Sequence, residues 1–230
     1  MADDQRHARI FGVLFIITFL TSIPAYLIFE SVLGDDPPGF IGGDGGMGWL
    51  YFAILLEFFL VLANVATAVA LYPIARRQNE ALAIGYVAAR IIESVFIAVG
   101  IVFVLGLVTM RLEGLGTDDM ATLLYELKDW TFLLGPGLIV PFGNGLILGY
   151  LMYRSGLVPR RMAWLGLIGG PIVFFSNVGI MFDWWDRSTV MILVLPEAIW
   201  ELFVGFYCAI FGFRRDSPIV RPNWRNSAAA

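Results

Sequence analysis

The sequence has very little of what most catalytic and metal sites are built from. It contains one cysteine, Cys208, and one histidine, His7. A single cysteine excludes an intramolecular disulfide, and these two residues cannot supply a zinc ligand set. The HExxH, G-x-S-x-G and P-loop patterns are also missing. We therefore predict no catalytic residue, no metal and no cofactor, and we lean against an enzyme.

Charge is scarce as well. Only 15% of the 230 residues are charged and 59% are hydrophobic, whereas a soluble domain carries roughly 25% charged residues. In water such a chain would expose large apolar patches, which a lipid bilayer accepts. No polar stretch is long enough for a separate soluble domain. We predict one integral membrane domain over 1–230 in the cell membrane, with a flexible tail at 214–230 and no nucleic-acid partner. The oligomeric state is left open.

Six apolar stretches stand out along the chain. About 20 apolar residues cross the roughly 30 Å of hydrocarbon, and in lipid a single segment must satisfy its own backbone hydrogen bonds as a helix. The first stretch follows Arg6 and Arg9 as a signal peptide would, but it is too long and lacks a cleavage site. The predicted fold class is all-α, a polytopic membrane helix bundle of six transmembrane helices at 10–29, 50–73, 81–110, 131–153, 162–182 and 190–213.

The arginines predict the orientation. Cytoplasmic loops carry the excess of Lys and Arg. With both termini in the cytoplasm, the outside holds only Arg111, Lys128 and Arg187. The eleven cations then inside are Arg6, Arg9, Arg76, Arg77, Arg154, Arg160, Arg161, Arg214, Arg215, Arg221 and Arg225.

Three segments have a distinct local character. The acidic, glycine- and proline-rich stretch 34–48 predicts an irregular outer loop. Residues 117–130 predict a short amphipathic helix on the outer surface, or else an outward extension of the fourth span. Two prolines and four glycines within 135–145 predict a kinked or interrupted fourth span. The glycines there favour close helix packing over an unwound binding site, with Gly145-x-x-x-Gly149 as the packing motif.

Ionisable residues inside the predicted spans form a polar seam. Such residues are costly in lipid and often mark function. At a rise of about 1.5 Å per residue, residues on different spans come out at matching depths. We predict that the second, third and sixth spans face one another across this polar seam. Its members are Glu57, Asn64, Arg90, Glu93, Glu197 and Glu201.

The seam holds more acids than bases. Arg90 can pair with Glu93 or Glu201, but it cannot neutralise four glutamates. The remaining carboxyl groups should be protonated, share protons or hold a cation. We therefore hypothesise that Glu57 and Glu197 form a proton- or cation-accessible site that opens to the outside.

Two motifs carry a resemblance to a known family. The turn Tyr150-Leu-Met-Tyr-Arg-Ser-Gly-Leu-Val-Pro-Arg160 and the run Arg90-Ile-Ile-Glu93 resemble those of prokaryotic membrane proteins catalogued as domain of unknown function 4386. The likeness covers most of 9–213, including the order of spans and a Glu-bearing last span. It implies an integral membrane bundle and no established activity. On physical grounds the arginines of this turn are better read as a topology anchor at the anionic leaflet than as an anion site.

Three functional readings follow. In the first, a small transporter-like or ligand-binding membrane protein handles a small molecule, a proton or a cation through the polar seam. In the second, a structural or accessory membrane protein uses the seam only to hold its helices together. The third and least favoured is an intramembrane enzyme.

Overall fold

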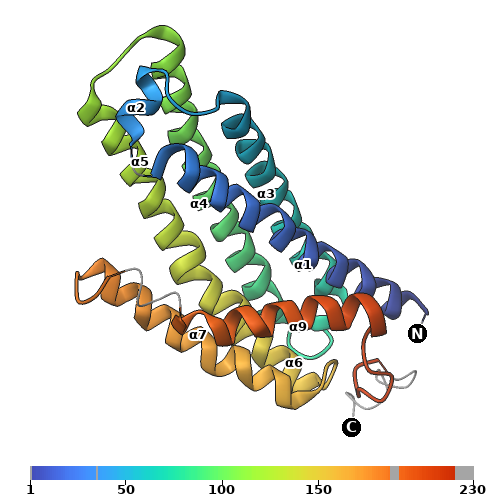
Figure 1. Cartoon of the computed structure of the whole chain (residues 1–230). Coiled ribbons are helices and arrows are strands. Elements are labelled where there is room, and N and C mark those ends of the chain that lie inside the picture. Colours follow the sequence, from blue (N-terminus) through green and yellow to red (C-terminus); the bar gives the residue numbers. More distant parts are fainter. Residues whose placement is uncertain (1, 35, 187–191, 221–230) are drawn as a thin grey trace.

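The computed structural model describes residues 2–34, 36–186 and 192–220, and all regular elements of this part are helices (Figure 1). The all-α prediction is confirmed. Arg187, Arg221 and Arg225, the start of the sixth predicted span and the end of the predicted tail lie outside the described residues. The elements are α1 (Ala2–Phe29), η1 (Glu30–Gly34), α2 (Pro37–Gly42), α3 (Met47–Ala75), α4 (Glu80–Glu113), α5 (Asp118–Phe132), η2 (Leu133–Ile139), η3 (Pro141–Leu148), α6 (Gly149–Ser155), α7 (Arg160–Met181) and α9 (Leu195–Phe211).

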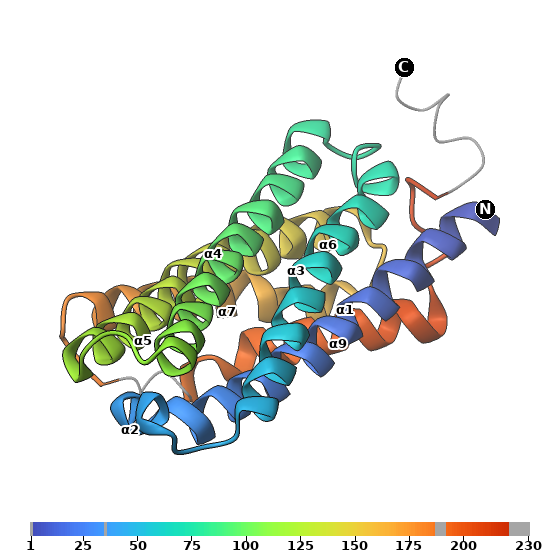
Figure 2. The same ribbon diagram turned by 90° about the horizontal axis from the view of Figure 1, so that it is seen from above.

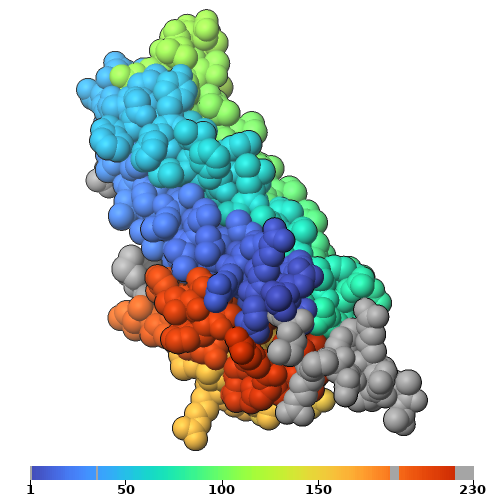
Figure 3. Space-filling model, turned by 90° about the vertical axis from the view of Figure 1, so that its right-hand side faces the viewer, coloured from blue at the N-terminus to red at the C-terminus, as the bar shows by residue number. Residues whose placement is uncertain are grey.

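Neighbouring helices close a ring. α1 packs between α3 and α9, and α3 packs against α4. α4 contacts the helix that runs from α5 through η3, this helix contacts α7, and α7 contacts α9 (Figures 1 and 2). Figure 3 shows α1 and α9 side by side on one face, with α3 beside α1. Side chains that point into the ring therefore meet groups from several helices.

The outer surface of the ring is apolar. Within the described ranges, five segments are long and apolar enough to cross a membrane: 2–34, 47–75, 80–113, 118–155 and 160–181. α9 has 17 described residues, so the count of six spans stays a prediction, as does the orientation of the termini. Large apolar side chains project outward from the helices, among them Leu20, Phe58, Val102, Phe175 and Phe211. Such a surface suits contact with lipid.

The fourth predicted span extends further than expected at its start. α5, η2, η3 and α6 form one uninterrupted helical segment, 118–155. Thr117 caps its first turn by accepting a hydrogen bond from the backbone N–H of Met120. Of the two alternatives for 117–130, the separate surface helix is wrong and the extension of the fourth span is confirmed, while its outward direction stays a prediction. The reason is that one face of α5 packs on α4 and buries Tyr125 and Lys128.

Proline and glycine widen this segment and do not break it. η2 and η3 are π-helical, and the N–H of Val140 bonds to the carbonyl of Gly135, five residues back. A proline has no N–H and its ring crowds the preceding turn. The wider π turn keeps the remaining backbone groups bonded around Pro136 and Pro141. Of the two predicted outcomes, a kink or an interruption, the interruption is wrong, and the helix is irregular where the sequence indicated it.

The stretch 34–48 is more ordered than predicted. Asp36 caps the short helix α2 by accepting a hydrogen bond from the N–H of Gly39 (2.9 Å). Arg111 of α4 donates hydrogen bonds to the carbonyls of Gly43 (2.6 Å) and Asp44 (2.7 Å). Its guanidinium also lies over the ring of Phe40. These contacts tie the connection down, so an irregular loop is only part of the description.

Candidate functional site

The polar residues lie between two apolar clusters. One cluster, at the end of the bundle where α3 ends and α4 begins, includes Phe11, Leu71 and Trp200. The other, towards the opposite ends of α3 and α4, includes Phe29 and Leu107. The seam residues of these helices fall between the two clusters, so a polar layer crosses the bundle at an intermediate depth.

Asn64, Arg90 and Glu93 form one fully bonded cluster between α3 and α4. Nη1 of Arg90 donates to Oε2 of Glu93 (2.7 Å), and Nδ2 of Asn64 donates to Oε1 of the same carboxylate (2.9 Å). Nη2 of Arg90 donates to Oδ1 of Asn64. All three residues are at least 95% buried, and the guanidinium lies over the ring of Phe15 from α1. One charge of each sign and matched hydrogen bonds make this cluster a strong structural tie.

Glu57 has a partner that the sequence analysis placed outside the membrane. Nζ of Lys128 donates to Oε1 of Glu57 at 2.8 Å, and each side chain is about 10% exposed. Lys128 also lies over the ring of Phe29, 4.3 Å from its centroid. Lys128 is therefore buried in the bundle and does not lie in an exposed connection, because α5 is continuous with η2 and packs on α4. The available signal was its position, three residues before a predicted span.

Glu201 is held by the π-helical segment. Nδ2 of Asn144 donates to Oε1 of Glu201 (2.6 Å), and Nε1 of Trp200 donates to the backbone carbonyl of Asn144 (2.9 Å). Glu201 is also close enough to Arg90 for their charges to attract. Asn144 and Trp200 were not among the predicted site residues. An asparagine between Gly143 and Gly145 in an apolar span was the signal for the first of them.

Glu197 is the exception in this layer. The residue is 3% exposed, and neither of its carboxyl oxygens has a hydrogen-bond partner among the described residues. It lies in a notch left by two glycines. A Cβ at Gly145 would be 3.0 Å from Oε1 of Glu197, and a Cβ at Gly169 would be 3.1 Å from Oε2. The packing admits the carboxyl group and gives it no donor.

A third unpartnered oxygen belongs to the same region. Oδ1 of Asn144 is buried without a hydrogen bond, while the amide nitrogen of this side chain is used by Glu201. Glu197 and Glu201 are four residues apart in α9, so they lie on one face of the helix. The carboxyl groups of Glu197 and Glu201 also interact electrostatically. We call Glu197, Glu201 and Asn144 the carboxyl centre.

The six predicted residues thus divide into three groups. Asn64, Arg90 and Glu93 bond to one another, Glu197 and Glu201 share a face of α9, and Glu57 pairs with Lys128. The second and third predicted spans do pack together, as expected. α9 packs mainly on α1 and α7, because the ring order places α1 between α9 and α3. The binding role of the six residues stays a prediction.

Comparison with known families gives one match. A family model described as "Domain of unknown function (DUF4386)" matches residues 10–212. Comparisons with curated proteins and with solved structures found no match. The match covers the carboxyl centre and all the candidate spans except the first residues of α1, and its description supplies no activity.

Proposed function

The chain belongs to the DUF4386 family, and since that name carries no chemistry, we propose from the site that the protein binds and releases a proton at its carboxyl centre. The observation that carries the proposal is Glu197, which is buried with two unpartnered carboxyl oxygens. A small proton-coupled membrane protein of the transporter type is the function that this geometry supports best.

The argument starts from the cost of a buried charge. An isolated carboxylate in a low-dielectric interior costs several kcal/mol unless a cation or several donors compensate it. Glu93 has Arg90, and Glu57 has Lys128. Among the described residues Glu197 has neither a paired cation nor a hydrogen-bond donor, and Glu201 adds a repulsive neighbour. A proton on Glu197 removes this cost and turns one oxygen into a donor.

A proton fits the centre better than a metal ion. Hard cations such as Mg²⁺ and Ca²⁺ take about six to eight oxygen ligands. The unpartnered oxygens in the carboxyl centre are two on Glu197 and one on Asn144. No group of three or more His, Cys, Asp and Glu residues suited to a metal occurs among the described residues. A protonated Glu197 needs only one acceptor, and the free amide oxygen of Asn144 has that chemistry.

Binding or release of a proton at Glu197 would also affect neighbouring charged residues. Glu201 interacts electrostatically with both Glu197 and Arg90. Loss of a proton from the centre therefore changes the balance of charge around Arg90, which ties α4 to α3 through Asn64. Intramembrane carboxyl groups that change protonation beside an arginine are a recurring element of proton-driven carriers.

The competing proposal is that the centre is only structural. A glutamic acid that stays protonated can serve as interhelical glue. The tight fit of Glu197 against two glycines supports this alternative. The two proposals differ in whether the proton exchanges with water, which can be measured.

Infrared difference spectroscopy on the purified protein tests the proposal. The parent is expected to show a protonated-carboxyl absorption at neutral pH that disappears reversibly as the pH rises. Glu197→Gln should remove this band. Glu57→Gln is the matched control and should leave it, because Glu57 is paired with Lys128. A band that never titrates would favour the structural role, and no carboxyl band at all would refute the proposal.

A sodium arm separates a proton from a metal cation. Replacing choline with sodium at constant pH and ionic strength should leave the band unchanged. A band that sodium suppresses in the parent would mean that a cation competes at the carboxyl centre, and would overturn the proton assignment.

A further inference from the structure

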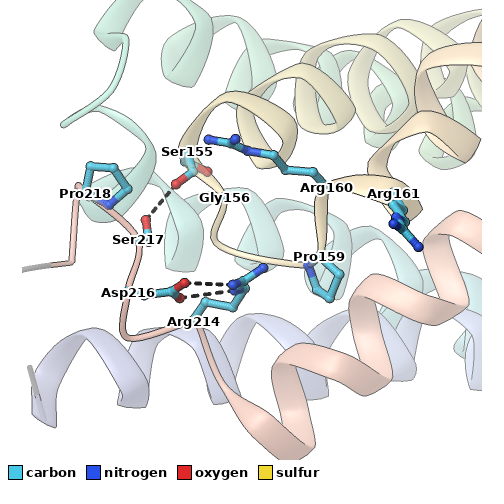
Figure 4. Close-up of a pocket in the computed structure, with 9 residues that line it drawn as sticks. All are labelled: Ser155, Gly156, Pro159, Arg160, Arg161, Arg214, Asp216, Ser217 and Pro218. Atoms are coloured by element: carbon cyan, nitrogen blue, oxygen red, sulfur yellow. Dashed lines mark hydrogen bonds and ion pairs between the residues drawn. The ribbon is translucent and has the colours of Figure 1, made fainter.

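A second polar feature lies far from the carboxyl centre, at the end of the bundle where α6 meets α7. A cavity of about 510 Å³ opens there between the α6–α7 turn and the chain that follows α9 (Figure 4). Its lining residues are Ser155, Gly156, Pro159, Arg160, Arg161, Arg214, Asp216, Ser217 and Pro218. The volume is within the range of about 300–1,000 Å³ that is usual for small-ligand sites.

Backbone contacts hold the two walls of this cavity together. The N–H of Arg214 donates to the carbonyl of Leu157 (2.9 Å), and Oγ of Ser217 donates to the carbonyl of Ser155 (2.7 Å). Phe213 and Val220, at the two ends of the segment that follows α9, are both buried. The part of the predicted flexible tail that the structure describes, 214–220, is therefore packed against the bundle and forms a defined wall.

The cavity is strongly basic. Three arginines line it and only one acid does, so the lining keeps a positive charge after Asp216 has paired with Arg214. Nε and Nη2 of Arg214 donate hydrogen bonds to the carboxylate of Asp216 (3.1 and 2.7 Å), and Nη1 of Arg214 does not take part in this bidentate pair. Nε of Arg160 donates to the carbonyl of Tyr153 (3.1 Å). Figure 4 shows the Arg160 guanidinium reaching along the turn towards Ser155.

The helix that begins at the cavity adds to the positive potential. α7 starts at Arg160, and its N-cap residue, Pro159, provides no side-chain hydrogen bond to the first turn. The unpaired N–H groups at a helix start carry a partial positive charge. Arginine side chains held in place beside them give the planar, bidentate donors that phosphate oxygens accept well.

We propose that this cavity binds a phosphate group, which is either the headgroup phosphate of an anionic lipid or a soluble phosphorylated compound. Arg160 and Arg214 would hold the phosphate oxygens from opposite walls. The aromatic pair Tyr153 and Trp164 next to the turn is typical of the membrane–water boundary, where lipid headgroups lie. The site is independent of the carboxyl centre.

The test compares two double variants that remove equal charge. Arg160→Gln with Arg214→Gln changes the cavity. Arg6→Gln with Arg9→Gln removes two exposed arginines of α1 that do not line it. In the lipid arm, native mass spectrometry follows the retention of phosphatidylglycerol against phosphatidylcholine. In the soluble arm, thermal shift is measured with sodium phosphate against sodium chloride at matched ionic strength.

The parent is expected to prefer phosphatidylglycerol in the lipid arm or to be stabilised by phosphate in the soluble arm. The cavity double variant should weaken that binding at least tenfold. The α1 double variant should retain it. Binding in the lipid arm alone assigns a headgroup site, and binding in the soluble arm alone assigns a metabolite site. Equal loss in both double variants would show general charge attraction. No preference for phosphatidylglycerol over phosphatidylcholine, together with no stabilisation by phosphate over chloride, would show that the cavity selects no anionic phosphate group. Each of these last two results overturns the proposal.

Discussion

At the scale of single residues, the buried charges differ mainly in how completely they are compensated. Arg90 has a carboxylate and an amide oxygen, and Lys128 has a carboxylate and an aromatic face. Glu197 packs beside Gly145 and Gly169, and neither of its carboxyl oxygens has a hydrogen-bond partner among the described residues. Residues of one type can thus have different roles, because the neighbouring helices decide which donors reach them.

The pair of Glu57 and Lys128 makes the first prediction. Lys128→Met leaves the Glu57 carboxylate buried without a cation, and loss of one member of a buried pair costs about 3–5 kcal/mol. The double variant Glu57→Gln with Lys128→Met removes both charges and should recover most of that loss. Denaturant unfolding in detergent, followed by tryptophan fluorescence, measures both. A double variant as unstable as Lys128→Met would show that the pair contributes by packing alone.

At the scale of elements, the π-helical segment decides how closely three helices approach. Its glycines face two different neighbours. A Cβ at Gly135 would be 2.7 Å from Cβ of Phe96 in α4, and one at Gly145 would be 2.6 Å from Cα of Gly170 in α7. The close packing expected of the Gly145-x-x-x-Gly149 motif is seen against α7, where Gly149 lies beside Leu167. The prolines account for the wider π-helical turns of this segment, and the glycines allow it to pack closely against α4 and α7.

Gly145→Ala tests this packing. The added methyl group would meet the backbone of Gly170 and the carboxyl group of Glu197, and overpacking of this kind costs about 1–3 kcal/mol. Gly48→Ala is the matched control, because Gly48 is a helical glycine with nothing within 4 Å of an added Cβ. Its stability should stay within about 1 kcal/mol of the parent. Equal changes in the two variants, in the same unfolding assay, would contradict the tight η3–α7 contact.

At the scale of the whole molecule, several described arginines lie at one end of the bundle. Arg77 of the α3–α4 connection pairs with Asp4 and also donates to the carbonyl of Ile219. The α6–α7 turn bonds to Arg214 at the same end. The structure therefore brings Arg77, the α6–α7 turn and Arg214 to one end of the bundle, as the sequence analysis expected of these cations. Which side of the membrane this end faces remains a prediction from the positive-inside rule.

Cysteine labelling tests the orientation. The parent has only the buried Cys208 and should not react with a membrane-impermeant maleimide in intact cells. Ala81→Cys and Glu113→Cys place exposed thiols at opposite ends of α4, about 50 Å apart at its usual rise. Glu113→Cys should label from outside, and Ala81→Cys should label only after the membrane is permeabilised. The reverse pattern would invert the predicted topology.

Much of the architecture follows from local properties of the chain. The apolar composition favours lipid contact, and in lipid each segment must satisfy its own backbone hydrogen bonds, so the all-α class and five long apolar helices were predictable. The depth match of Arg90 and Glu93 with Asn64 was also predictable, because rise per residue is constant along a helix. The continuity of α5 with the fourth span was harder to predict. A lysine such as Lys128 usually marks an exposed segment, and only the structure shows that Lys128 pairs with Glu57 inside the bundle.

The sequence by itself determined that this protein is an all-α chain suited to a lipid bilayer, with more acidic than basic residues inside its apolar segments. Only the tertiary structure decided which acids are compensated. Lys128 donates to Glu57 and Asn144 donates to Glu201, whereas no donor in the described part of the chain bonds to Glu197. The sequence could not show this, because these contacts join helices that are distant in the chain. The same reason applies to the basic cavity, whose second wall is formed by residues about 60 positions after the first. Composition and hydrophobic periodicity describe each helix separately, whereas a site depends on which faces of different helices pack together.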